Sequence, residues 1–183
     1  MRIEEVISEF ESVKVQVMTE FASLSEQQLN WKPAADAWSV GQCIEHLILS
    51  KQLFQPLLDT VASGTRTNTF WENWSPLRVF GTKLYFRYIR NDKTKVKAPT
   101  ERIVPMSDID GDIVERFARQ QEQIMEKLKD IPQVVVDRTT LTSPFLRIVT
   151  YKLSDGLLIL AEHDKRHIRQ ALRVIALEGF PKV

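Results

Sequence analysis

The sequence predicts an all-α protein built as one four-helix bundle over residues 1–183, with long connections between the helices. Four separate segments place apolar residues three and four positions apart, which is the spacing of a helix with one buried face. Glycine is scarce, at 6 residues, and this argues against a loop-rich β protein. Hydrophobic residues make up 43% and charged residues 27%, a balance that indicates a globular domain in water. Four apolar stripes bury one another most simply in a four-helix bundle.

The first helix is expected at residues 2–24. Its spacing of apolar residues continues over about six turns, so one face is buried along its whole length. That face carries Ile3, Val6, Ile7, Phe10, Val13, Val17 and Phe21. Residues 25–38 follow, with Pro33 and several small residues, and are expected to be a long connection.

The second helix is expected to begin after Ser39 and to run to about Ala62. Gln42, three residues after Ser39, completes a capping-box pattern in which each side chain bonds the backbone N–H of the other residue. Pro56 falls inside this helix and is expected to kink it or to shift one of its ends. The expected core face carries Val40, Ile44, Leu47, Ile48, Phe54 and Leu58.

Residues 64–106 are the least regular part of the sequence. Seven aromatic residues lie close together there: Phe70, Trp71, Trp74, Phe80, Tyr85, Phe86 and Tyr88. We expect a helix at 76–90 and an exposed loop, broken by prolines, at 91–105. The aromatic segment 70–88 has two open interpretations: it completes the core, or it forms a lid or a dimer surface.

The third long helix is expected at about 108–130, with Ser107 as its N-cap. Its inward residues are Ile109, Ile113, Phe117, Ile124 and Leu128. The stretch 134–140 is rich in β-branched residues but stands alone, so we expect an extended connection and not a sheet. Ser143 and Pro144 are expected to start a helical turn.

The last helix is expected to begin at a Ser154 cap and to end before Gly179. It carries His163 and His167, which leave the same face because four residues are close to one helical turn. Both border the apolar stripe that faces the bundle. His46, the third of the 3 histidines, borders the apolar stripe of the second helix in the same way. All three are therefore expected to face the interior.

Three inward histidines have two interpretations. A single inward histidine is more often a core residue with a satisfied hydrogen bond than a ligand. Three imidazoles in one core each need such a partner, and leaving one unpaired costs about 1–3 kcal/mol. A divalent metal would satisfy three lone pairs at once and keep an open position for water or substrate, as catalytic zinc sites do. The spacing alone leaves both interpretations open.

The stretch 163–167, His-Asp-Lys-Arg-His, is also close to the H-E-x-x-H motif of zinc proteases, with Asp164 in place of Glu. The match is weak because Asp is one methylene shorter than the expected base. Few residues remain downstream for a third ligand, and Glu178 is the sole acid near the end. His46, from upstream, fits better as the third ligand and belongs to a different architecture.

Charge and cysteine content exclude several classes of protein. A formal charge of +1 and a pI near 7.8 leave no electrostatic footprint for nucleic acid. The single cysteine, Cys43, cannot form an internal disulfide, so nothing indicates an oxidising compartment. The N-terminus lacks a signal-peptide core, and the aliphatic run at 157–161 is too short to cross a bilayer. We therefore expect a cytoplasmic protein with no nucleic-acid partner and no membrane partner.

Two stretches of the sequence resemble the signatures of the DinB-like superfamily. "WKPAADAWSVGQCIEHLILS", at 31–50, is similar to its N-terminal signature, a Trp-Ser followed by a helix that bears His-Leu. "AEHDKRHIRQALRV", at 161–174, is similar to its C-terminal helix with H-x3-H followed by Gln. The order of the two motifs, their separation and the expected helices also fit, so the resemblance covers nearly the whole chain.

The resemblance implies a bundle of up-down-down-up type in which His46, His163 and His167 hold a divalent metal. Imidazole ligands suit zinc, nickel, copper and iron alike, and we expect zinc or nickel first, with iron or manganese as further candidates. Family members often form dimers. Some are thiol-dependent transferases that use low-molecular-weight thiols, and others are classed as metal-dependent hydrolases. The segment 70–88 is longer than the minimal family pattern, so the resemblance does not assign it a role.

We therefore expect a homodimeric, metal-dependent enzyme that acts on a small molecule. Asp164 is expected to support a metal ligand or to act as a base, with a solvated or capping carboxylate as the equally open interpretation. Cys43, one turn before His46, is expected to be a packing residue and not a ligand. Trp38 and Gln42 are candidates for the pocket mouth. The alternative function is a non-catalytic metal-binding protein, or a structural or dimerisation protein.

Overall fold

The computed structural model describes residues 2–75, 89 and 100–182, and these are predominantly helical, as predicted. Four helices are long: α1 (Ile3–Phe21), α3 (Val40–Ala62), α6 (Ile113–Lys129) and α8 (Leu153–Ile175). The shorter elements are α2 (Glu26–Asn30), α4 (Phe70–Trp74), the 3₁₀ turn η1 (Glu101–Ile103), α7 (Gln133–Arg138), β1 (Thr140–Thr142) and β2 (Thr150–Lys152).

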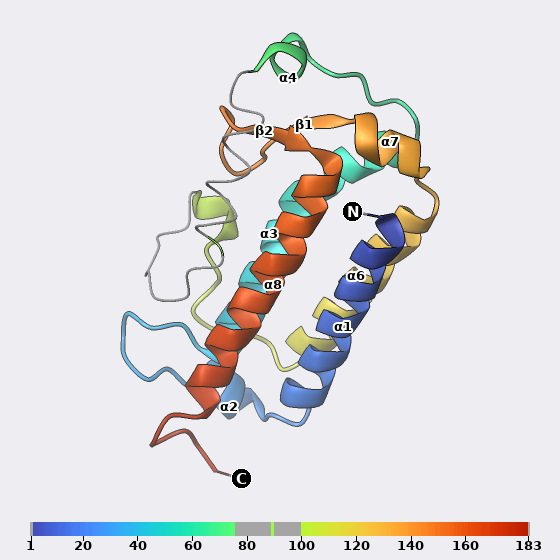
Figure 1. Cartoon of the computed structure of the whole chain (residues 1–183). Helices are drawn as coiled ribbons and strands as arrows, with labels where there is room; N and C mark the ends of the chain where they lie inside the picture. Colours follow the sequence, from blue (N-terminus) through green and yellow to red (C-terminus); the bar gives the residue numbers. More distant parts are fainter. Residues whose placement is uncertain (1, 76–88, 90–99, 183) are drawn as a thin grey trace.

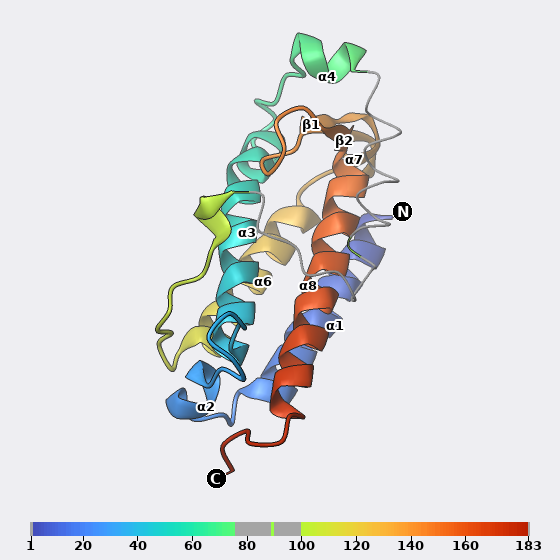
Figure 2. The ribbon, with the colours of Figure 1, turned by 90° about the vertical axis from the view of Figure 1, so that its left-hand side faces the viewer.

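The four long helices lie side by side, and each packs against two of the others (Figures 1 and 2). Both α1 and α3 contact α6 and α8. Their inward faces carry the apolar residues that the helical spacing predicts, and the predicted core residues of α3 and of the 108–130 segment are all buried. The predicted all-α class is therefore confirmed.

The apolar interior is divided into two clusters of buried side chains. The first lies toward the β1–β2 end and includes Phe10, Phe54 and Tyr151. The second lies toward the α2 end and includes Val17, Ile44, Phe117 and Ile168. Between them on three of the long helices, polar side chains take positions that point into the core.

Those intervening polar residues are Lys51 of α3, Gln121 of α6 and Asp164 of α8, and all three are buried. The Lys51 Nζ atom lies 2.5 Å from Asp164 Oδ1, and Gln121 Nε2 donates to Asp164 Oδ2 at 3.0 Å. Lys51 Nζ also lies 4.7 Å from the centroid of the Phe117 ring, within the range of a cation–π contact. Three helices are thus joined through one buried carboxylate.

The capping box predicted for the second helix is present. Gln42 N donates to Ser39 Oγ at 3.1 Å, and Ser39 N donates to Gln42 Oε1 at 3.2 Å. Pro56 lies inside α3, which nevertheless continues to Ala62, so the proline does not shift that end. The connection at 25–38 contains the short helix α2, which begins at a second capping box formed by Ser25 and Gln28.

The third long helix begins at Ile113 and not near 108, so the prediction of Ser107 as its cap was wrong. The physical reason lies at Ile109, whose backbone N–H donates to Asn30 Oδ1 at 2.9 Å and whose carbonyl accepts from Asn30 Nδ2 at 2.8 Å. These bonds hold the segment against the end of α2 in a non-helical conformation. Asp112 occupies the N-cap position instead.

The predicted extended connection at 134–140 was also wrong. Most of it belongs to α7, and β1 begins at Thr140. β1 pairs antiparallel with β2, with Leu141 opposite Tyr151, and both of these side chains are buried. The sequence segment looked isolated because its pairing partner lies about ten residues further along the chain.

Two smaller predictions near this hairpin were wrong as well. Ser154 does not cap the last helix, because α8 begins one residue earlier, where Leu153 N donates to the Thr139 carbonyl at 2.9 Å. Ser143 and Pro144 do not start a helical turn. Ser143 N donates to the Val149 carbonyl at 2.8 Å and closes the loop of the hairpin.

The aromatic segment 70–88 can be followed only in part. Phe70, Trp71 and Trp74 lie on α4 and are exposed, so these three do not complete the core. The helix expected at 76–90 lies outside the described residues except for Ile89, which is helical and buried. The loop expected at 91–105 is described only from residue 100, where η1 follows. Among the described helices, none is both long and apolar enough to span a bilayer.

Replacing Lys51 with Met should lower the free energy of unfolding by about 3–5 kcal/mol, because the Asp164 carboxylate is then buried without its counter-charge. The matched variant K51M/D164L removes both charges together and is expected to recover most of that loss. Urea unfolding followed by far-ultraviolet circular dichroism measures both. If the double variant is as unstable as Lys51→Met, the charge imbalance is not the cause.

Candidate metal centre

Helices α3 and α8 bring the three histidines of the chain into one group. His163 and His167 lie one turn apart on α8, and His46 faces them from α3. The Nε2 atoms of His46 and His163 are 3.1 Å apart, and one candidate ligand atom from each histidine lies within 4.8 Å of the others. The structure therefore confirms the prediction that all three histidines face the interior.

The tautomer of His46 is fixed by its surroundings. His46 Nδ1 lies 2.7 Å from the backbone carbonyl oxygen of Ile103 in η1. A carbonyl oxygen only accepts, so Nδ1 carries the proton of the neutral ring and Nε2 keeps its lone pair. This lone pair is the one that points toward His163. A backbone carbonyl behind one ring nitrogen is the usual way in which a metal-binding histidine is oriented.

The segment that supplies this carbonyl is itself tied to α3. Gln42 Nε2 donates to the Met106 carbonyl at 2.8 Å, and Met106 N donates to Glu45 Oε2 at 2.8 Å. The two side chains lie in the first two turns of α3, and they bond the carbonyl and the N–H of the same residue, Met106. They hold the chain after η1 along the helix, and so keep the Ile103 carbonyl opposite the His46 ring.

Trp38, just before the cap of α3, covers the histidine group. Its ring stacks on that of His167, with centroids 5.7 Å apart and an interplanar angle of 30°, and it lies 4.9 Å from the His46 ring. His46 and His167 are buried, whereas His163 keeps some exposure to solvent. His163 is therefore the most exposed of the three histidines.

The surroundings keep the His46 and His163 imidazoles neutral. Burial lowers the pKa of His46 to about 4, against the opposing effect of the bond to Ile103 and with a smaller contribution from the Lys51 charge. Burial also lowers the pKa of His163 well below its ordinary value, and the other two histidines, Lys51 and Arg166 add to this shift. Neutral rings are the forms that present lone pairs to a metal ion.

Asp164 follows His163 directly but points away from the group, to Lys51 and Gln121. Its side chain is buried, which excludes the interpretation as a solvated carboxylate. Burial raises the pKa of Asp164 and lowers that of Lys51, and the attraction between the two charges opposes both shifts.

Two acids beside the histidines also lie away from the group. Glu45 accepts from Met106, and Glu162 lies 3.6 Å from Lys165 on the same helix. Cys43 is buried among the apolar residues of the second cluster, as the packing interpretation predicts. Gln42 is occupied by the cap and by Met106.

This arrangement can hold a divalent metal ion through His46, His163 and His167. Tetrahedral metal–nitrogen bonds of about 2.0–2.1 Å place ligand nitrogens about 3.3 Å apart, close to the 3.1 Å between His46 Nε2 and His163 Nε2. The candidate ligand atoms of all three histidines lie within 4.8 Å of one another. In the ranges 2–75 and 100–182, no further His, Cys, Asp or Glu joins the three.

Sequence reasoning missed three contributors to this region. Lys51 and Gln121 have the helical spacing of core positions but were passed over as polar residues. Their position inside an apolar stripe was the available signal. The Ile103 carbonyl has no signal in the sequence, because any residue offers a carbonyl and only the fold places this one beside His46.

Comparison with known proteins gives one match. A family model described as the DinB superfamily matches residues 9–171, which include all three histidines and parts of all four long helices. Neither the curated proteins nor the solved structures yield a match to the chain.

The Cys43 thiol should resist alkylation in the folded protein. Burial raises the pKa of Cys43 to about 12, so the reactive thiolate is scarce at mildly alkaline pH and the sulfur is also covered. We expect labelling by iodoacetamide to be at least about 100-fold slower in the native state than in urea, measured by intact mass. Rapid labelling of the native protein that added zinc prevents would instead place the sulfur at the metal.

Proposed function

The chain belongs to the DinB superfamily, and from this premise we propose that it is a divalent-metal-binding protein that acts as a metal-dependent enzyme on a small molecule. The observation that carries the proposal is the group of three histidines, with His46 held in the tautomer that directs its Nε2 lone pair at the others. We infer also that the four long helices form the up-down-down-up bundle of the resemblance, which their mutual packing supports.

The residues of the chain would each contribute to such a site. His46, His163 and His167 would bind the ion, the Ile103 carbonyl would hold the His46 ring, and Trp38 would exclude water from one side. When bound, an ion with three neutral imidazole ligands acts as a Lewis acid and lowers the pKa of a water or thiol that joins it. Hydrolysis and thiol transfer are the two reaction classes that this supports. Zinc and nickel are the metals we favour, with iron and manganese next.

Asp164 has a supporting role in this proposal. Both of its oxygens already have partners, Lys51 and Gln121, so it is poorly placed to accept a proton from a substrate. Its bonds to α3 and α6 hold the part of α8 that carries His163. We therefore propose that it positions the helix and does not act as the base.

A second candidate is a protein in which the histidine group is non-catalytic. The 3.1 Å contact between His46 Nε2 and His163 Nε2 favours it, because the two rings can satisfy each other without an ion. Under this interpretation a metal, if bound, serves stability or dimerisation. The homodimer, the low-molecular-weight thiol partner and the cytoplasmic location stay predictions.

Metal analysis of the protein purified without a histidine tag tests the site. We expect about one equivalent of bound metal and a melting temperature that rises on adding zinc or nickel. His46→Ala should weaken zinc binding by about 100-fold or more, because a ligand and its Ile103 contact are both lost. The matched control, Gln16→Ala on the exposed face of α1, should bind as the parent protein does. Unchanged occupancy in His46→Ala would exclude this ligand set.

Cobalt substitution separates the enzyme from the structural protein. If three histidines leave a position open, adding dithiothreitol to the cobalt form should produce a thiolate-to-cobalt absorption band, and His163→Ala should abolish it. A cobalt spectrum that does not respond to thiol would favour the non-catalytic candidate, in which the ion has no exchangeable position.

A further inference from the structure

Helix α4 has the reverse of the usual arrangement of polar and apolar side chains. Its acidic residue, Glu72, is 2% exposed, whereas Phe70 is 80% exposed, Trp74 is 74% exposed and Trp71 is 42% exposed. The Phe70 and Trp74 rings stack on each other, with centroids 6.3 Å apart and an interplanar angle of 25°. Clusters of exposed large aromatic side chains are uncommon on globular domains, and they mark surfaces that bind a protein, a membrane or a ligand.

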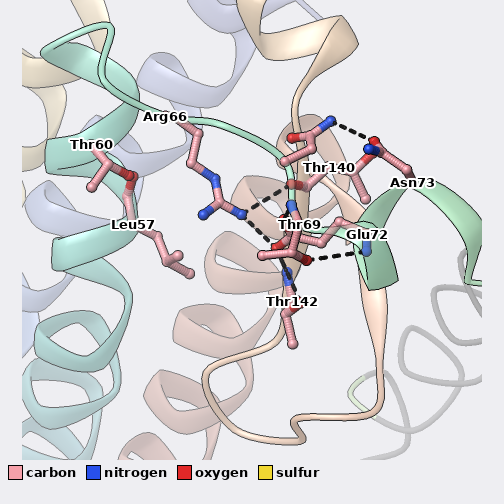
Figure 3. A network of polar contacts seen from close by, with 9 residues as sticks. Leu57, Thr60, Arg66, Thr69, Glu72, Asn73, Thr140 and Thr142 are labelled. Atoms are coloured by element: carbon pink, nitrogen blue, oxygen red, sulfur yellow. Dashed lines mark hydrogen bonds and ion pairs between the residues drawn. The ribbon is translucent and has the colours of Figure 1, made fainter.

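A network of buried polar contacts holds α4 in this orientation (Figure 3). Glu72 Oε1 lies 2.5 Å from an Arg66 guanidinium nitrogen and accepts from Thr142 N at 2.7 Å. Glu72 Oε2 accepts from Thr69 N at 2.8 Å, which caps the helix. Burial raises the pKa of Glu72, but these bonds and the Arg66 charge outweigh it, so the carboxylate stays ionised. The aromatic face is therefore fixed outward by contacts to β1.

A hollow of about 560 Å³ lies beside α4. It is formed between the chain around α4 and the helix α7, and its polar lining includes Arg66, Arg138, Asn68 and Asn73. Val134 and Val135 give it an apolar wall. Guanidinium and amide donors above an apolar wall suit a phosphate group attached to a hydrocarbon portion.

The position of α4 favours a membrane over a protein as the partner. The helix lies at one extremity of the molecule, beyond the β1–β2 hairpin and far from the C-terminal end of α8 (Figures 1 and 2). Tryptophan on a projecting tip fits the headgroup level of a bilayer, where Trp and Tyr rings concentrate, and phenylalanine fits the adjoining acyl boundary. Arg138, whose side chain lines the hollow between α4 and α7, adds a positive charge on this side of the molecule. This charge complements an anionic lipid surface.

We propose that the tip formed by Phe70, Trp71 and Trp74 is a docking surface for an anionic phospholipid bilayer, with the adjacent hollow of Arg66 and Arg138 receiving a lipid phosphate. The protein lies on the membrane and does not span it, which agrees with the lack of a spanning helix among the described residues. This departs from the expectation of no membrane partner, which rested on spanning segments and signal peptides alone. The proposal is independent of the histidine group, which lies on other elements.

Co-sedimentation with vesicles tests the proposal. The full chain should bind vesicles that contain about one third phosphatidylglycerol in phosphatidylcholine, and should bind pure phosphatidylcholine at least about tenfold more weakly. Binding to the anionic vesicles should weaken as salt is added. The variant F70S/W74S should lose at least about tenfold in binding, and Arg138→Glu should lose the preference for anionic lipid.

A matched control is V15S/L177S, which removes two exposed apolar residues away from α4 and should bind vesicles as the parent does. Circular dichroism and zinc binding of all variants should match the parent, so that lost binding is not lost folding. The proposal is overturned if the parent protein does not co-sediment with anionic vesicles. It is also overturned if inorganic phosphate binds the hollow while vesicles do not, or if F70S/W74S only abolishes self-association in sedimentation velocity.

Discussion

The buried ion pair between Lys51 and Asp164 is the constraint on which the rest of this structure depends. Burying two charges costs free energy that is offset only when the charges are paired. Lys51 and Asp164 can pair at only one alignment of α3 and α8. Sliding either helix by one turn, about 5.4 Å, would separate them. Gln121 brings α6 to the same point. His163 adjoins Asp164, and His46 lies five residues before Lys51, so the alignment that pairs the charges also gathers the histidines.

The histidine group, near the middle of the bundle, and the α4 tip, at one end of the molecule, are each oriented by a polar contact. In each, a polar contact inside the protein fixes the direction of a group that faces outward or into a site. At the histidines the contact is between His46 Nδ1 and the Ile103 carbonyl, and at α4 it is between Glu72 and Arg66. Both depend on segments between the long helices, which are therefore part of the chemistry and not merely connections.

The long helices and the three histidines could be predicted from the sequence because both are encoded locally, by apolar spacing and by the i, i+4 pair on α8. The segments between them could not. Ser107 has the chemistry of a cap, but the Asn30 side chain competes for that backbone. Val134 to Val136 have the composition of a strand, yet they form a helix beside a hairpin whose second strand is distant in sequence. Lys51 and Gln121 were overlooked because polar residues are ordinarily assigned to the surface.

The polar layer across the core has a consequence for how the molecule unfolds. Apolar contacts make the interior cooperative, but here they fall into two clusters that meet at Lys51, Gln121 and Asp164. Apolar packing lost in one cluster does not directly remove apolar contacts from the other, so the two clusters are expected to differ in local stability. Amide protons near the β1–β2 hairpin would then exchange through openings that leave those around His46 protected. The histidines lie beside this polar layer, so the α4 end and its hairpin can loosen first while the layer still holds the histidine group together.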